Sequence, residues 1–123
     1  MHRFAKWVFN LAGAYGVLAL VPMYFSEAKF GLENPPAINH PGFYYGFIGL
    51  ALVFQLVFFL IARDPARYRL FMVPAILEKL SFALPALILT SQGRLAQPML
   101  LGAAIDLILC ALFFAAFLKT PRA

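Results

Sequence analysis

Two ionisable residues stand side by side in an apolar stretch of the chain. The segment LFMVPAILEKLSFALPALILT is long enough to cross a bilayer, yet Glu78 and Lys79 lie near its middle. A carboxyl group in such a place can carry a proton or bind a substrate, and an ammonium group can pair with an acid. Each of the other apolar stretches contributes one more polar side chain: Asn10, Gln55 or Asp106. Together these five residues form a predicted polar cluster in the membrane interior.

Helical geometry and depth indicate how the cluster pairs. Neighbouring residues on a helix are about 100° apart, so Glu78 and Lys79 are not expected to satisfy one another. The Lys79 side chain is long enough to reach Asp106, which lies only slightly deeper in the membrane. Glu78 is then left with Gln55 and Asn10 as hydrogen-bond donors. We therefore expect a Lys79–Asp106 ion pair beside a glutamate bound by two amides.

The candidate catalytic residues are Glu78, Asp106 and His40. His40 could shuttle a proton with Glu33, but one histidine and scattered glutamates are too few to form a zinc site. The single cysteine, Cys110, excludes an intrachain disulfide and a CxxC redox pair. The sequence contains no glycine-rich phosphate loop, HExxH motif or nucleophile elbow. We therefore expect no metal, no cofactor and no nucleic-acid partner.

The amino-acid composition indicates whether the chain folds in water or in a membrane. Hydrophobic residues make up 63% of the 123 residues and charged residues only 12%, and the mean hydropathy is +0.84. An ordinary soluble domain is about 45–50% apolar, and a chain this small cannot bury so much apolar surface in a core of its own. The sequence therefore predicts an integral membrane protein in contact with the lipid bilayer.

Four apolar segments of roughly 20 residues match the thickness of the hydrocarbon core. Short basic or polar turns separate the last three, so neighbouring helices are expected to run antiparallel. We expect an all-α, up-down-up-down four-helix bundle that forms a single membrane domain over residues 1–123. The expected helices cover residues 4–25, 43–62, 70–90 and 98–118.

Basic residues predict the orientation of the bundle. Seven Lys and Arg residues lie at the two termini and in the 63–69 turn, whereas the other two loops carry only Lys29 and Arg94. By the positive-inside rule both termini face the cytoplasm, and the expected location is a bacterial plasma membrane. One alternative stays open, because MHRFAK, the apolar stretch after it and SEA at 26–28 resemble a cleavable signal peptide.

Small residues indicate where helices can approach closely, either within the chain or between copies. Glycines spaced four apart in HPGFYYGF form a GxxxG pattern, and alanines near the C-terminus repeat the same spacing. A second copy or another membrane subunit is therefore an expected partner. The predicted helix-packing positions are Gly42, Gly46, Gly102, Ala111 and Ala115.

The stretches HPGFYYGFIGLALVFQLVFFLIARDPARYR and LEKLSF resemble an uncharacterised group of short bacterial four-span membrane proteins that are loosely DoxX-like. The resemblance covers residues 35–85. It implies a four-helix membrane fold, and no activity comes with it.

Three functions remain open on these observations. The first is a non-enzymatic membrane module that acts as an accessory subunit or small homo-oligomer. The second is a proton-linked carrier of a small molecule, with Glu78 as the titrating group. The third is an intramembrane acid–base enzyme that acts on an apolar substrate through Glu78 and Asp106, with His40 near the entrance.

Overall fold

The computed structural model describes residues 2–122, and these residues form an all-α structure. Four long helices account for most of the chain, and a short helix and two 3-10 turns lie between them. The elements in chain order are α1 (Arg3–Leu20), η1 (Val21–Phe25), α2 (Glu27–Glu33), α3 (Pro41–Arg63), η2 (Arg69–Phe71), α4 (Met72–Ser91) and α5 (Gln97–Lys119).

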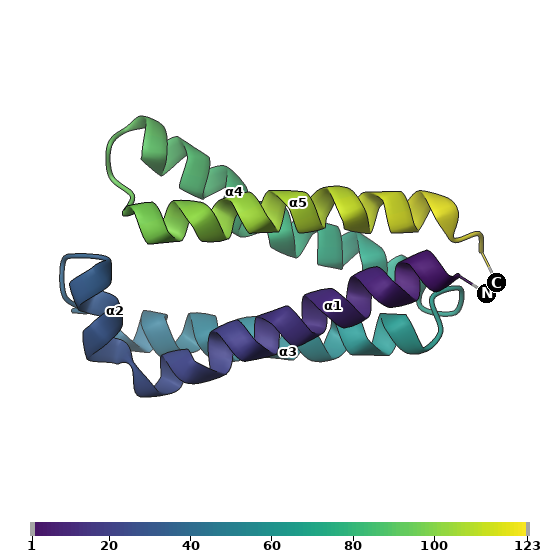
Figure 1. Ribbon diagram of the computed structural model, residues 1–123, viewed down its shortest axis with the longest axis horizontal. Coiled ribbons are helices and arrows are strands. Elements are labelled where there is room, and N and C mark those ends of the chain that lie inside the picture. Colours follow the sequence, from purple (N-terminus) through teal and green to yellow (C-terminus); the bar gives the residue numbers. More distant parts are fainter. Residues whose placement is uncertain (1, 123) are drawn as a thin grey trace.

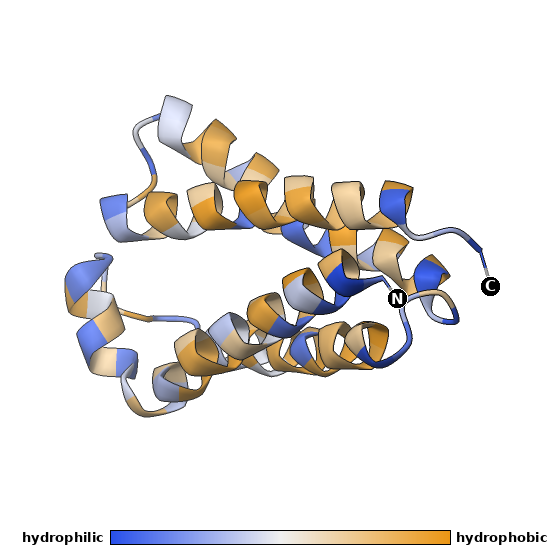
Figure 2. Cartoon of the chain, turned by 45° about the vertical axis from the view of Figure 1, so that its right-hand side comes forward, coloured by the Kyte–Doolittle hydropathy of each residue, from blue (hydrophilic) through white to orange (hydrophobic). Residues whose placement is uncertain are grey.

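Four segments are long and apolar enough to cross a membrane, as the sequence predicted. Each has 23 residues, and each begins and ends within two residues of its expected bounds. At about 1.5 Å per residue such a helix is about 34 Å long, which matches a hydrocarbon core of about 30 Å. Figure 2 shows the hydrophilic residues gathered largely at the ends of these helices. The spans are Arg3–Phe25, Pro41–Arg63, Arg69–Ser91 and Gln97–Lys119.

The four helices are arranged as two antiparallel hairpins. α1 packs mainly on α3, and α4 packs mainly on α5. Figure 1 shows the hairpins close together near the two chain ends and diverging toward α2. We call the end with the chain termini and the 64–68 turn the terminal end, and the end with α2 and the 92–96 turn the loop end. The helices therefore form a bundle that is closed at one end and splayed at the other.

Three phenylalanine rings join the two hairpins in the terminal half of the bundle. Phe9 of α1 stacks on Phe113 of α5 with ring centroids 4.3 Å apart, and Phe58 of α3 contacts Phe113 at 5.0 Å. All three side chains are fully buried. Aromatic pairs at such distances contribute about 0.5–1.5 kcal/mol beyond their buried area. This aromatic core explains why the hairpins stay together on the terminal side.

Two cationic side chains add further contacts at the terminal end. Arg69 donates a hydrogen bond from Nε to the carbonyl oxygen of Thr120, and its guanidinium carbon lies 3.8 Å from the centre of the Phe117 ring. Lys119 Nζ lies 4.4 Å from the centre of the Phe4 ring. The Arg69 contacts connect η2, just before α4, to the end of α5. The Lys119 contact connects the end of α5 to the start of α1.

Two glycines allow the close contact between α1 and α3. A Cβ atom added at Gly13 would lie 2.8 Å from the Phe59 ring, and one added at Gly16 would overlap the Gln55 side chain. Gln55 is 1% exposed, and its Nε2 donates to the carbonyl oxygen of Ala51 at 2.8 Å. The amide therefore has little room to move away.

The small residues expected to pack helices take a lesser part within the chain. Among residues 2–122, no atom beyond the local helix lies within 4 Å of a Cβ built on Gly42 or Gly46. Ala111 is also exposed and Ala115 is half-buried, whereas a Cβ built on Gly102 would lie 3.9 Å from the Phe82 ring, an ordinary contact distance. Gly42 and Gly46 therefore do not pack against another helix of the same chain, and their contact with a second copy or another subunit stays a prediction.

The loop between the first two spans contains the short helix α2, which lies outside the four helices expected from the sequence. Both η1 and α2 lie against the start of α3: Tyr44 donates from its hydroxyl to the carbonyl oxygen of Met23 in η1 at 2.6 Å, and its ring centroid lies 5.4 Å from that of Phe30 in α2. The neighbouring Tyr45 hydroxyl donates to Glu27 Oε1 at 2.9 Å. The two tyrosines therefore hold the loop against the start of α3.

We expect Gly16→Ala to lower the free energy of unfolding by about 1–3 kcal/mol, because a methyl group there overpacks the Gln55 site. Gly46→Ala is the matched control and should be neutral or slightly stabilising, since alanine has the higher helix propensity. Thermal unfolding in detergent measures both changes. In a Gln55→Ala background the cost of Gly16→Ala should largely disappear. Equal losses from the two glycine variants would contradict the contact.

Candidate functional site

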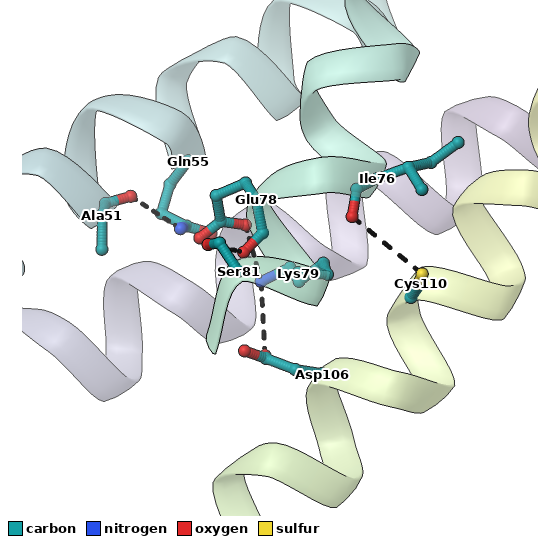
Figure 3. Close-up of polar contacts among 8 residues, drawn as sticks. All are labelled: Ala51, Gln55, Ile76, Glu78, Lys79, Ser81, Asp106 and Cys110. Atoms are coloured by element: carbon teal, nitrogen blue, oxygen red, sulfur yellow. Dashed lines mark hydrogen bonds and ion pairs between the residues drawn. The ribbon is translucent and has the colours of Figure 1, made fainter. Parts of the chain in front are cut away.

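The charged residues of the third span meet the aspartate of the fourth span inside the α4–α5 hairpin. Lys79 is 5% exposed, and its Nζ lies 3.5 Å from Asp106 Oδ1 and 3.5 Å from Glu78 Oε2 (Figure 3). The expected contact between Lys79 and Asp106 is therefore present. One ammonium group serves two carboxyl groups, and we call these three residues the charge cluster.

Glu78 has a different partner from the one expected. The sequence analysis separated it from Lys79 because the two residues are about 100° apart on the helix. The flexible four-carbon stem of Lys79 nevertheless brings Nζ within 3.5 Å of Glu78 Oε2. The hydrogen bond that Gln55 donates from Nε2 goes to the carbonyl oxygen of Ala51 and not to this carboxyl group. The 100° between the two backbone positions does not keep the groups apart, because the lysine side chain is long and flexible.

Asn10 does not join the charge cluster. It is exposed, and it lies with Trp7, Leu11 and Ala14 on the outer side of α1. The buried face of this helix is set by bulky core residues such as Phe9 and by the glycines that approach α3. Asn10 follows Phe9 directly, so its side chain points about 100° away from the buried face. The expected hydrogen bond from Asn10 to Glu78 is therefore wrong.

Gln55 is buried close to the middle of α3 but is incompletely satisfied. Its Nε2 is bonded to Ala51, whereas no group among residues 2–122 donates to its Oε1. The oxygen lies against the backbone of Gly16. A buried acceptor without a donor costs free energy, so this amide adds little to the stability of the α1–α3 contact. It does require a glycine at the facing position of α1.

The charge cluster rests on the aromatic core. Lys79 Nζ lies 5.2 Å from the centre of the Phe58 ring, where an ammonium group is attracted by the ring electrons. Close by, the Cys110 thiol lies 4.0 Å from the carbonyl oxygen of Ile76, as expected for a packed cysteine (Figure 3). Sequence reasoning missed Phe58, because nothing distinguishes one phenylalanine from the others in an apolar span. This ring connects the cluster to the other hairpin.

His40 lies at the loop end, away from the two carboxyl groups. Lys79 contacts Phe58, which is 18 residues beyond His40 in the sequence, or about 27 Å along α3. Around His40 a pocket of about 390 Å³ opens between the hairpins. It is lined mainly by apolar and aromatic side chains: Met23, Phe30, Pro36, Ala37, Ile38, Asn39, His40, Phe43, Tyr44, Phe47, Phe82 and Met99.

The pocket and the charge cluster lie one above the other along the same helices. Phe82 in the pocket is one helical turn from Glu78 on α4, and Met99 is two turns from Asp106 on α5. Within residues 2–122 no group of three His, Cys, Asp or Glu side chains is placed to hold a metal ion. The ionisable groups of the site are two acids and one amine, and the pocket on their loop side is mainly apolar.

Comparison with known proteins gives no family for the chain. No family model matches it, and no curated protein or solved structure is detectably similar to it. The resemblance of residues 35–85 to short DoxX-like proteins therefore stays a prediction. What the protein does is inferred from its geometry.

We expect Lys79→Met to destabilise the protein by about 3 kcal/mol, because it leaves two partly buried carboxyl groups without a cation. Asp106→Leu should cost less, since Lys79 keeps its contact with Glu78. The triple variant Glu78→Gln/Lys79→Met/Asp106→Leu should recover most of the loss, because no charge is left unpaired. Unfolding in detergent compares the variants. A triple variant no more stable than Lys79→Met would contradict the pairing.

Proposed function

We propose that the protein is a non-enzymatic membrane module, an accessory subunit or small homo-oligomer whose charge cluster is structural. The observation that supports this best is that Lys79 is shared by two carboxyl groups and also contacts the Phe58 ring. The ammonium group is thus paired with acids of its own chain. Such a cluster fixes the register of α4 and α5 and leaves the outer helix faces free for partners.

The proposed orientation places the terminal end in the cytoplasm of a bacterial cell. Seven Lys and Arg residues lie at that end or beside it, against Lys29 and Arg94 at the loop end. Cytoplasmic loops carry such an excess of basic residues. The resemblance to short bacterial four-span proteins supports a plasma-membrane location.

A proton-linked carrier is the second candidate, and the excess of acids over bases in the cluster favours it. Glu78 and Asp106 share one lysine, and their side chains keep 18% and 17% of their area exposed. The apolar pocket lies on the loop side of the cluster, where the hairpins diverge (Figure 1). An acid below such an opening can exchange a proton when a ligand enters. In this reading Glu78 is the titrating group.

The third candidate, an intramembrane acid–base enzyme, is not favoured by the positions of its residues. His40 lines the pocket near the loop end, as a residue at an entrance would. It is nevertheless about 27 Å along α3 from the ring that Lys79 contacts. Neither carboxyl group is among the residues that line this pocket, although Phe82 of the pocket lies one helical turn from Glu78, so His40 makes no direct contact with either acid.

We expect the purified protein in liposomes to move no protons above the rate of protein-free vesicles under an imposed pH gradient. A trapped pH-sensitive dye measures this rate. The triple variant without the three charges should also keep the native-gel mobility of the parent complex, because the cluster is structural. If the protein does conduct protons and Glu78→Gln abolishes the flux, the module hypothesis is wrong and the carrier hypothesis is favoured.

The topology is tested by reporter fusions at four positions. Fusions at residues 30 and 94 should report the external side, and fusions at 66 and 123 should report the cytoplasm, because the basic residues lie on the side of the latter pair. Paired alkaline phosphatase and fluorescent-protein reporters distinguish the two sides. An external report from residue 66 would reverse the proposed orientation.

A further inference from the structure

One amide side chain lies exposed on a lipid-facing helix surface. Asn10 is seven residues into the first span, or about 10 Å from its start, and its side chain has no hydrogen-bond partner within residues 2–122. Lipid chains offer neither donor nor acceptor, and an unpaired amide in hydrocarbon is costly. The other amide at this depth, Gln55, is buried inside the chain. Asn10 therefore needs a partner from outside.

The surface around Asn10 has the spacing of a helix-packing seam. Its outward residues follow one another at intervals of four, three and four, and each is exposed. Such alternation keeps one stripe facing a neighbouring helix over several turns. At its centre lies a hollow of about 380 Å³ beside the small side chain of Ala14. The residues of this α1 seam are Trp7, Leu11, Ala14 and Leu18, with Asn10 at its edge.

We propose that two copies of the chain associate through the α1 seam, with Asn10 of each copy hydrogen-bonded to α1 of the other. An amide carries both a donor and an acceptor, so a two-fold axis along the membrane normal lets identical groups satisfy each other. Both copies insert in the same direction, which makes the two helices parallel. Ala14 allows their backbones to approach, as small residues do in membrane dimers.

This inference rests on the proposed function, since it names the partner of the membrane module. It places the interface on α1, where an amide lacks a partner, rather than on the glycines of α3. The exposed faces of α3 and α5 carry apolar residues such as Leu56 and Ile108, which lipid solvates equally well. A second copy is the occupant that supplies a matching amide at the same depth without any other protein.

Cysteine cross-linking in liposomes tests the seam. In a Cys110→Ala background we expect Leu11→Cys and Ala14→Cys to form disulfide-linked dimers on mild oxidation. Leu56→Cys and Ile108→Cys are matched controls, because these positions are 66% and 61% exposed against 56% for Leu11. The controls should stay monomeric. Equal cross-linking at all four positions would overturn the proposal, because it would indicate random collision.

The role of the amide is tested by the dimer affinity of labelled protein in liposomes, followed by energy transfer. Asn10→Leu should raise the dissociation constant about tenfold, since two symmetric interhelical hydrogen bonds of modest strength are lost. Asn10→Gln should restore most of the affinity. An unchanged constant for Asn10→Leu would overturn the proposal. So would cross-linking of Leu11→Cys to a different protein in native membranes, although the accessory-subunit function would then stand.

Discussion

The structure depends on a single ammonium group that two acids share. Lys79 Nζ lies 3.5 Å from both Glu78 and Asp106, in a span whose other side chains are almost all apolar. Charged groups at membrane depth are tolerated only when they face the bundle interior and find partners. The need to keep Lys79 inside therefore fixes which face of α4 turns inward and where α5 must cross it. Breaking this contact leaves buried charge, whereas removing all three groups leaves an ordinary apolar hairpin.

The two halves of the bundle differ in how closely the hairpins pack. In the terminal half the rings of Phe9, Phe58 and Phe113 fill the space between the hairpins, and the Lys79 contact with Phe58 ties the charge cluster to them. Toward the loop end the hairpins diverge and an apolar pocket of about 390 Å³ lies between them (Figure 1). The aromatic contacts of the closed half hold the hairpins together, and the pocket lies in the open half. The structural-module hypothesis therefore rests on the terminal half of the bundle, and the carrier hypothesis rests on the loop half.

Much of the fold could be predicted from the sequence because the bilayer imposes length, polarity and depth. The four spans follow from apolar length, and the Lys79–Asp106 contact follows from counting residues to a common depth. The buried face of α1 could not be predicted from the sequence. Asn10 and Gly13 lie less than one helical turn apart, and only tertiary packing decides which of them is buried. The close approach at Gly16 was missed for a related reason, since it depends on a glutamine from another helix. No sequence signal distinguishes a glycine that packs from one that faces lipid.

The most direct measurement is the distance between the Lys79 side-chain nitrogen and the Asp106 carboxyl carbon in bilayers, by solid-state magnetic resonance on selectively labelled protein. Asp106 and Asp64 are the two aspartates, and Asp64 lies in the exposed turn after α3, so the buried signal is assignable. We predict a dipolar coupling of the strength of a direct ammonium–carboxylate contact, and its loss in Lys79→Met. A coupling too weak for direct contact, with both groups facing water, would contradict the account.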